Sequence, residues 1–154
     1  MKYQANRDYI SNDVVMTPTI TAKKLVEHFK PKGKGLEPCC GTGNILQFLP
    51  CADWCEIEKG KDFFDYKEKD DYIFTNPPWS KIRPFMEHAM EIADEIYMLF
   101  TINHLWTKAR LKVIEEKEFE LKKFVSLRHR KNFRKADFSS VWYIFHEVIK
   151  ATSN

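Results

Sequence analysis

A glycine-rich turn limits the choice of folds more than any other stretch of this sequence. It reads Gly35-Leu36-Glu37-Pro38-Cys39-Cys40-Gly41-Thr42-Gly43-Asn44-Ile45-Leu46, a short apolar strand that leads through glycines into a predicted helix start. Glycine allows tight turns and close approach of the backbone to a ligand. A strand, a glycine loop and a helix in this order form the nucleotide cradle of doubly wound α/β folds. The pattern lacks the third glycine of the dinucleotide fingerprint and the Lys-Ser/Thr of a phosphate loop. A plain turn is the alternative.

A second predicted handover from strand to helix reads Thr75-Asn76-Pro77-Pro78-Trp79-Ser80, after the apolar run Tyr72-Ile73-Phe74. Prolines fix φ and donate no hydrogen bond, and residues that precede prolines are extended. The turn therefore offers acceptors, namely the Asn76 side-chain oxygen and main-chain carbonyls, beside a flat indole. A flat substrate that donates protons from an amino group, such as a nucleobase, fits this arrangement. An ordinary Pro-Pro turn with a core Trp is the alternative.

These residues resemble the NPPW/NPPY signature of the S-adenosylmethionine-dependent amino-methyltransferases, most closely the N6-adenine DNA methyltransferases. The resemblance implies that the Asn76 oxygen and the carbonyl of Pro77 accept the amino protons of a flipped adenine. It also implies that Trp79 stacks on the base, and that S-adenosylmethionine is the cofactor. The expected catalytic residues are Asn76, Pro77, Pro78 and Trp79.

The same resemblance implies a cofactor site made of several short segments. Thr17 would line the methionine end, and Glu37 with the loop amides would hold the amino-acid end. Glu56, with Glu58 as second choice, would accept from the ribose hydroxyls, and Asp62 from the adenine amino group. Solvated acidic residues are the alternative for the last three. The expected cofactor-binding residues are Thr17, Pro18, Glu37, Pro38, Gly41, Gly43, Glu56, Asp62 and Phe63.

Apolar periodicity predicts the remaining elements. Helices are expected over residues 22–29 and 82–93, the second capped by Ser80, and a charged amphipathic helix is expected from 101 to about 117. A buried parallel strand is expected at 96–100, and two closing strands at 119–127 and 140–148. This alternation predicts an α/β protein with a mostly parallel sheet. The family resemblance implies a Rossmann-like methyltransferase fold, with seven strands and an antiparallel last strand.

The sequence departs from the family between residues 57 and 71. Only four residues separate Ile57 from Asp62, and the segment 65–71 is short and charged. These segments leave no room for the helices that the family places between its strands. We therefore expect a reduced core around the cofactor site.

Length and composition indicate a single domain, since the chain has 154 residues, of which 44% are hydrophobic and 31% are charged. We expect one methyltransferase domain over residues 1–154 with no separate target-recognition domain, similar to compact enzymes of phages and mobile elements. The polar N-terminus and the absence of a long apolar run predict a cytoplasmic protein. Four cysteines without zinc spacing and five scattered histidines predict reduced thiols and no metal.

Positive charge is concentrated late in the chain. Residues 106–135 contain eleven Lys/Arg and four Asp/Glu, a net of +7, whereas the whole chain carries +3. Such segregation predicts a polyanionic partner on one side of the protein. A solvated surface hairpin is the alternative. The expected nucleic-acid-binding residues are Arg128, Arg130, Lys131, Phe133, Arg134 and Lys135.

The function predicted from these features is transfer of a methyl group from S-adenosylmethionine to the N6 amino group of adenine in DNA. RNA adenine methylation and protein-glutamine methylation share the motif, although glutamine methylation fits an acidic or neutral docking face better. Cytosine-N4 methylation fits less well, because Ser usually precedes the prolines there. A catalytically idle methyltransferase fold that binds nucleic acid is a different class. Intact Asn76, Gly41 and Gly43 argue against that class.

Overall fold

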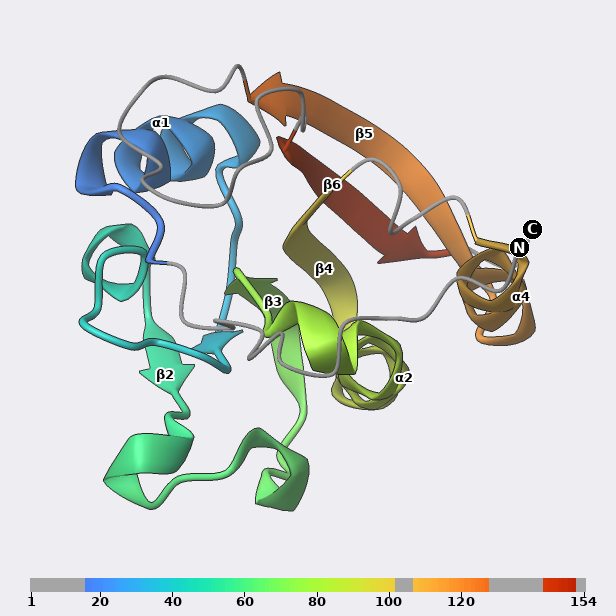
Figure 1. Cartoon of the computed structure of the whole chain (residues 1–154), viewed down its shortest axis with the longest axis horizontal. Helices are drawn as coiled ribbons and strands as arrows, with labels where there is room; N and C mark the ends of the chain where they lie inside the picture. The colour runs from blue at the N-terminus through green and yellow to red at the C-terminus, as the bar shows by residue number, and fades with distance from the viewer. Residues whose placement is uncertain (1–15, 102–106, 128–142, 152–154) are drawn as a thin grey trace, which may run out of the picture.

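The computed structural model describes residues 16–101, 107–127 and 143–151 (Figure 1). Six strands in these residues form one sheet with the order β2-β1-β3-β4-β6-β5. The strands are β1 (Gly35–Glu37), β2 (Ala52–Trp54), β3 (Asp70–Thr75), β4 (Ala93–Thr101), β5 (Phe119–Leu127) and β6 (Tyr143–Lys150). The first four strands pair in parallel, and β6 runs antiparallel to both of its neighbours. The mostly parallel sheet with an antiparallel last strand is therefore confirmed.

The centre of the sheet is apolar on both sides. Tyr72, Ile73 and Phe74 of β3 are fully buried, and Ile96 of β4 is nearly so. Successive side chains of a strand point to opposite faces, so an unbroken apolar run requires cover on both faces. For residues 96–99 of β4, this agrees with the buried strand that the apolar run predicts.

Helix α1 (Thr19–Phe29) covers one face, and helices α2 (Ile82–Ile92) and α4 (Lys108–Glu116) cover the other (Figure 1). Leu25 of α1 belongs to the same cluster as Tyr72 and Phe74. Phe85 of α2 belongs to a second cluster that contains Ile73. The alternation along β3 thus assigns its residues to two separate cores, one for each layer of helices.

Two predicted helix boundaries can be compared with the structure. Pro84 lies in the first turn of α2, as expected, but Ser80 is not its cap. Residues Trp79–Lys81 form the 3-10 turn η4, in which the Lys81 N–H donates to the Pro78 carbonyl at 3.0 Å. This turn moves the helix start past Ser80, and Lys81 becomes the residue before the first helical position.

The reduced core is visible between the first three strands. The connections contain only the 3-10 turns η1 (Leu46–Phe48), η2 (Ile57–Lys59) and η3 (Phe63–Asp65). The missing helices between β2 and β3 agree with the prediction. The helix expected after the glycine loop was wrong, because Pro50 stops a helix and β2 begins at Ala52. The described residues form six strands, whereas the family resemblance implies seven for the whole fold.

The later elements follow the predicted pattern with shifted ends. Strand β5 has the predicted bounds, and β6 begins at Tyr143, while residues 140–142 of its predicted range lie outside the described residues. Residues 102–106 of the predicted charged helix lie outside them as well. No helix in the described part of the chain is long and apolar enough to cross a membrane. The same residues contain no cluster of side chains that could hold a metal ion, and all four cysteines are free thiols.

Candidate active site

The glycine loop after β1 and the Asn-Pro-Pro-Trp turn after β3 begin side by side. Strands β1 and β3 are parallel neighbours, with Leu36 paired to Ile73. The chain therefore leaves β1 at Glu37 and β3 at Thr75 at the same edge of the sheet. In doubly wound folds, ligands bind at the carboxyl edge of the strands, next to such neighbouring turns.

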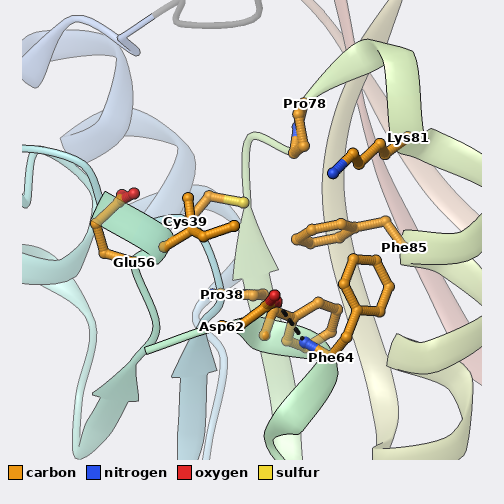
Figure 2. A pocket seen from close by; sticks show the side chains of 10 residues that line it. Pro38, Cys39, Glu56, Asp62, Phe64, Pro78, Lys81 and Phe85 are labelled. Atoms are coloured by element: carbon orange, nitrogen blue, oxygen red, sulfur yellow. Dashed lines mark hydrogen bonds between the residues drawn. The ribbon is translucent and has the colours of Figure 1, made fainter. Parts of the chain in front are cut away.

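A cavity of about 200 Å³ opens between these turns (Figure 2). Glu56 and Cys39 lie on one side of it, and Pro78, Lys81 and Phe85 on the other. Among the predicted site residues, it brings four expected cofactor-binding residues next to Pro78 of the predicted catalytic turn. The full lining is Pro38, Cys39, Glu56, Ile57, Asp62, Phe63, Phe64, Pro78, Lys81 and Phe85.

Aromatic rings form the inner wall of this cavity. Phe63 and Phe85 lie 4.4 Å apart between ring centroids, and Phe64 and Phe85 lie 5.7 Å apart. The carboxylate of Asp62 lies beside them and accepts from the Phe64 N–H at 3.0 Å, which holds it in place. An aromatic wall with a fixed carboxylate at its rim suits a ring that carries an amino group.

Glu56 lines the cavity and also binds the glycine loop. Its Oε2 accepts from the Gly41 N–H at 2.7 Å, and Lys59 donates to the Gly41 carbonyl at 3.0 Å. Both main-chain groups of Gly41 are thus bound from the turn after β2. Glu58, the second choice in the sequence, is exposed and does not line the cavity, whereas Glu56 does.

A smaller cavity of about 30 Å³ adjoins the first through Cys39. It brings together Thr17, Glu37 and Asn76, which come from three separate segments of the chain. The remaining lining comes from the glycine loop and the residue before Thr17. The full lining is Met16, Thr17, Glu37, Cys39, Cys40, Asn44, Ile45 and Asn76.

Glu37 is the most unusual group in this part of the site. It is 1% exposed, and its Oε2 has no hydrogen-bond partner among the described residues. Burial raises the pKa of Glu37 to about 8; the adjacent Thr75 hydroxyl and the Cys39 amide oppose this shift, and the charge of Glu56 adds to it. A buried carboxyl group with an unsatisfied oxygen at a cavity favours a cationic or hydrogen-bond-donating ligand there.

Hydrogen bonds join the predicted catalytic Asn to the glycine loop. The Asn76 Nδ2 donates to the Thr17 Oγ1 at 3.2 Å, and the Asn44 Nδ2 donates to the Thr17 carbonyl at 2.9 Å. The Thr42 hydroxyl donates to the Asn44 Oδ1 at 3.2 Å. Thr17 therefore connects two turns that are far apart in sequence.

No protein-family model matches the chain, and no curated protein matches it in sequence. Solved methyltransferase structures do resemble it. An inferred class I S-adenosylmethionine-dependent methyltransferase from Listeria monocytogenes is 14% identical, with a TM-score of 0.63 over 94% of this chain and 64% of its own. An inferred RNA methyltransferase from Pyrococcus horikoshii is 14% identical, with a TM-score of 0.59 over 87% and 83%. Magnesium protoporphyrin IX methyltransferase from Synechocystis PCC 6803, solved with bound S-adenosylhomocysteine, is 11% identical, with a TM-score of 0.60 over 86% and 83%.

The chain has the class I methyltransferase fold. The expected Rossmann-like fold class is thereby confirmed. At this level of identity the similarity establishes the fold, and the substrate has to be argued from the residues at the site.

The other predicted site residues differ in their burial and in their contacts. Pro77 is buried, and Trp79 is half-buried and packs against both core clusters, so its indole has a structural role whatever else it contacts. Pro18 precedes the first turn of α1. Gly41 and Gly43 both have left-handed backbone angles, with φ of 50° and 84°. A Cβ on Gly41 would lie 2.8 Å from the Met16 side chain, whereas one on Gly43 would face open space.

Sequence reasoning missed several residues of the candidate site. Lys81, Phe64 and Phe85 line the larger cavity because the start of α2 and the turn η3 face it, which no local pattern shows. Asn44 could have been suspected, because it is an amide side chain directly after the second loop glycine.

The predicted nucleic-acid-binding residues, from Arg128 to Lys135, lie outside the described residues. The strands on either side of them are described. Leu127, the last residue of β5, pairs with Tyr143, the first residue of β6, and Tyr143 also pairs with Thr101 at the end of β4. The segment therefore leaves and rejoins the sheet at the edge that carries the candidate site.

Proposed function

We propose that this chain transfers the methyl group of S-adenosylmethionine to the N6 amino group of adenine in DNA. The observation that carries the proposal is the Asn76-Pro77-Pro78-Trp79 turn, which stands at the carboxyl end of β3 with Pro78 on the larger cavity and Asn76 on the smaller one. The fold, shared with enzymes that use this cofactor, supports the reaction class. The chemistry of the turn supports an amino group as the acceptor.

The two adjoining cavities fit the two ends of the cofactor. The aromatic wall and the carboxylate of Asp62 suit an adenine ring, and Glu56 suits ribose hydroxyls. Glu37, with its unsatisfied buried oxygen, suits the ammonium group of the methionine end. A carboxylate bonded to a cation in a buried site is worth more than a neutral hydrogen bond.

When bound, S-adenosylmethionine supplies an activated methyl group on a positively charged sulfur. Asn76 and the carbonyl of Pro77 accept the two protons of the target amino group and hold it in place. Its nitrogen lone pair, otherwise delocalised into the base, would then be available to the activated methyl group, with the methyl–sulfur bond breaking and one amino proton leaving to water. The contribution of the chain is orientation and electrostatic stabilisation.

Covalent catalysis by a cysteine is disfavoured at this site. Cys39 lies in the walls of both cavities, and burial, together with the adjacent carboxyl group of Glu37, raises the pKa of its thiol. The thiol, which is a weak nucleophile, is therefore the form present near neutral pH. This supports direct transfer from cofactor to amino group.

The charge of the chain supports a nucleic acid over a protein substrate. The net charge of +7 between residues 106 and 135 suits a phosphate backbone. The target base has to leave its stack to reach the turn. RNA adenine is the second candidate, because the neighbour from Pyrococcus horikoshii is an inferred RNA methyltransferase.

The test uses labelled S-adenosylmethionine with single-stranded DNA, duplex DNA and RNA, followed by analysis of the methylated nucleosides. N6-methyladenine from DNA is the expected product. Asn76→Ala is expected to lower the rate by about 10²–10³, the scale seen when a polar partner of a transition state is lost. Its affinity for S-adenosylhomocysteine should stay near that of the wild type. Lys24→Ala, an exposed change on α1, is the control. Label incorporated only into protein would overturn the proposal.

A further inference from the structure

Thr17 contacts both the turn after β3 and the glycine loop after β1. It is 4% exposed and lines the smaller cavity together with Asn76 and Asn44. Its hydroxyl oxygen accepts from the Asn76 Nδ2 at 3.2 Å, and its carbonyl accepts from the Asn44 Nδ2 at 2.9 Å. Sequence reasoning connected Thr17 with the cofactor and gave it no relation to Asn76.

We infer that Thr17 is a positioning residue that anchors the Asn76 side chain, so that the Asn76 amide is held where it can bind the amino group of the methyl acceptor. The inference rests on the proposed function and deepens it. An amide carries its oxygen and its nitrogen on opposite sides of the same carbon. With Nδ2 donating to Thr17, the Asn76 oxygen points away from Thr17 within the plane of the amide.

The orientation of this amide decides which substrate groups the turn can bind. An amino group on an aromatic ring donates two hydrogen bonds and requires acceptors. A reversed Asn76 would present N–H donors, which suit a ring carbonyl and repel an amino group. Because the Thr17 hydroxyl can both donate and accept, it anchors the Asn76 side chain, and the distinction between an amino group and a ring carbonyl comes from the Asn76 amide itself.

Asn44 extends this arrangement to the glycine loop. It holds the main chain of Thr17, and the Thr42 hydroxyl donates to its Oδ1 at 3.2 Å. The glycine loop, which we propose binds the cofactor, therefore also holds Thr17 next to Asn76 through Asn44. The effect of Thr17 is indirect, because it acts on the substrate through the Asn76 amide.

The first test compares Thr17→Val, which removes the hydroxyl and nearly keeps the volume, with Thr17→Ser, which keeps the hydroxyl. Thr17→Val should lower kcat about 10- to 100-fold, with KM for the nucleic acid within about threefold, and Thr17→Ser should restore most of kcat. In an Asn76→Ala background, Thr17→Val should have less than a twofold further effect, because both changes remove the same interaction. Independent, multiplicative effects of the two changes would overturn the inference.

The second test needs no activity. The side-chain amide protons of Asn76, assigned by their loss in Asn76→Ala, are observed by NMR in the ligand-free protein. They should shift and exchange faster with water in Thr17→Val but not in Thr17→Ser. Unchanged signals in Thr17→Val would overturn the positioning role. The expected signals, combined with a wild-type protein that methylates no nucleic acid, would instead reject the proposed function and leave the contact in place.

Discussion

At the scale of single residues, Glu37 links stability to ligand binding. Its carboxyl group is 1% exposed, with one oxygen that has no partner among the described residues. Such a group is unfavourable in the free protein when ionised, and favourable when a cation occupies the adjoining cavity. A binding site can therefore be the place where a free protein loses stability.

The pH dependence of stability follows from the pKa of Glu37. Burial raises it from 4.5 to about 8, so the folded protein keeps a proton that the unfolded chain releases. Stability should fall as pH rises between these two values, with a contribution of up to about 1.4 kcal/mol per pH unit. Glu37→Gln should remove this contribution, as measured by urea unfolding of the ligand-free protein across the window. Glu58→Gln, at an exposed position, is the matched control. Equal slopes for the wild type and Glu37→Gln would contradict the assignment.

At the scale of elements, the glycine loop is held by the turn after β2. Glu56 binds the Gly41 N–H and Lys59 binds its carbonyl, so a loop without a following α-helix still has a defined conformation. The surroundings of Gly41 and Gly43 also differ. Both have positive φ, but only at Gly41 does the space for a side chain coincide with Met16, which lines the smaller cavity.

Gly41→Ala and Gly43→Ala should therefore differ. Each should reduce the free energy of unfolding by about 1 kcal/mol, because a left-handed backbone angle is unfavourable for alanine. Gly41→Ala should in addition displace Met16 and weaken S-adenosylhomocysteine binding by about tenfold or more, which corresponds to about 1.4 kcal/mol. Calorimetric titration of both variants checks this. A larger loss of affinity in Gly43→Ala would show that the ligand approaches the loop from the other side.

At the scale of the whole molecule, charge is distributed unevenly along the chain. Strand β6, which follows the basic residues 128–135, begins beside β4, and β5, which precedes them, ends beside β6 at the edge that carries the candidate site. The remainder of the chain, outside residues 106–135, has a net charge of about −4, obtained as +3 minus +7. A nucleic acid should therefore approach this edge and avoid the rest of the surface.

The salt dependence of DNA binding tests this arrangement. Phosphate contacts release counterions, with a slope of about 0.9 in log affinity against log salt for each contact on duplex DNA. Arg130→Ala combined with Arg134→Ala should lower that slope by about one to two units and leave binding of S-adenosylhomocysteine unchanged. Lys67→Ala combined with Lys69→Ala, at exposed positions just before β3 and so at the opposite edge of the sheet, is the matched control. An unchanged slope in the arginine variant would favour a protein substrate.

The sequence alone was sufficient for features that depend on a few neighbouring residues. The apolar run at 72–74 predicted a strand and the run at 96–100 a buried parallel strand, and the short charged segments predicted a core without its usual helices. Local rules failed where adjacent elements competed. Pro50 and β2 left no room for a helix after the glycine loop, and the η4 turn displaced Ser80 from the start of α2.

The geometry of the candidate site depends on the tertiary structure. Thr17 and Asn76 meet across 59 positions of the chain because α1 and β3 pack together, and no spacing rule predicts a contact of that range. The raised pKa of Glu37 depends on burial, which arises only when the layers close over β1. The sequence determined which chemical groups are present and which turns carry them. Packing decided which of those groups face the same cavity, because residues distant in sequence are brought together only when both faces of the sheet are covered.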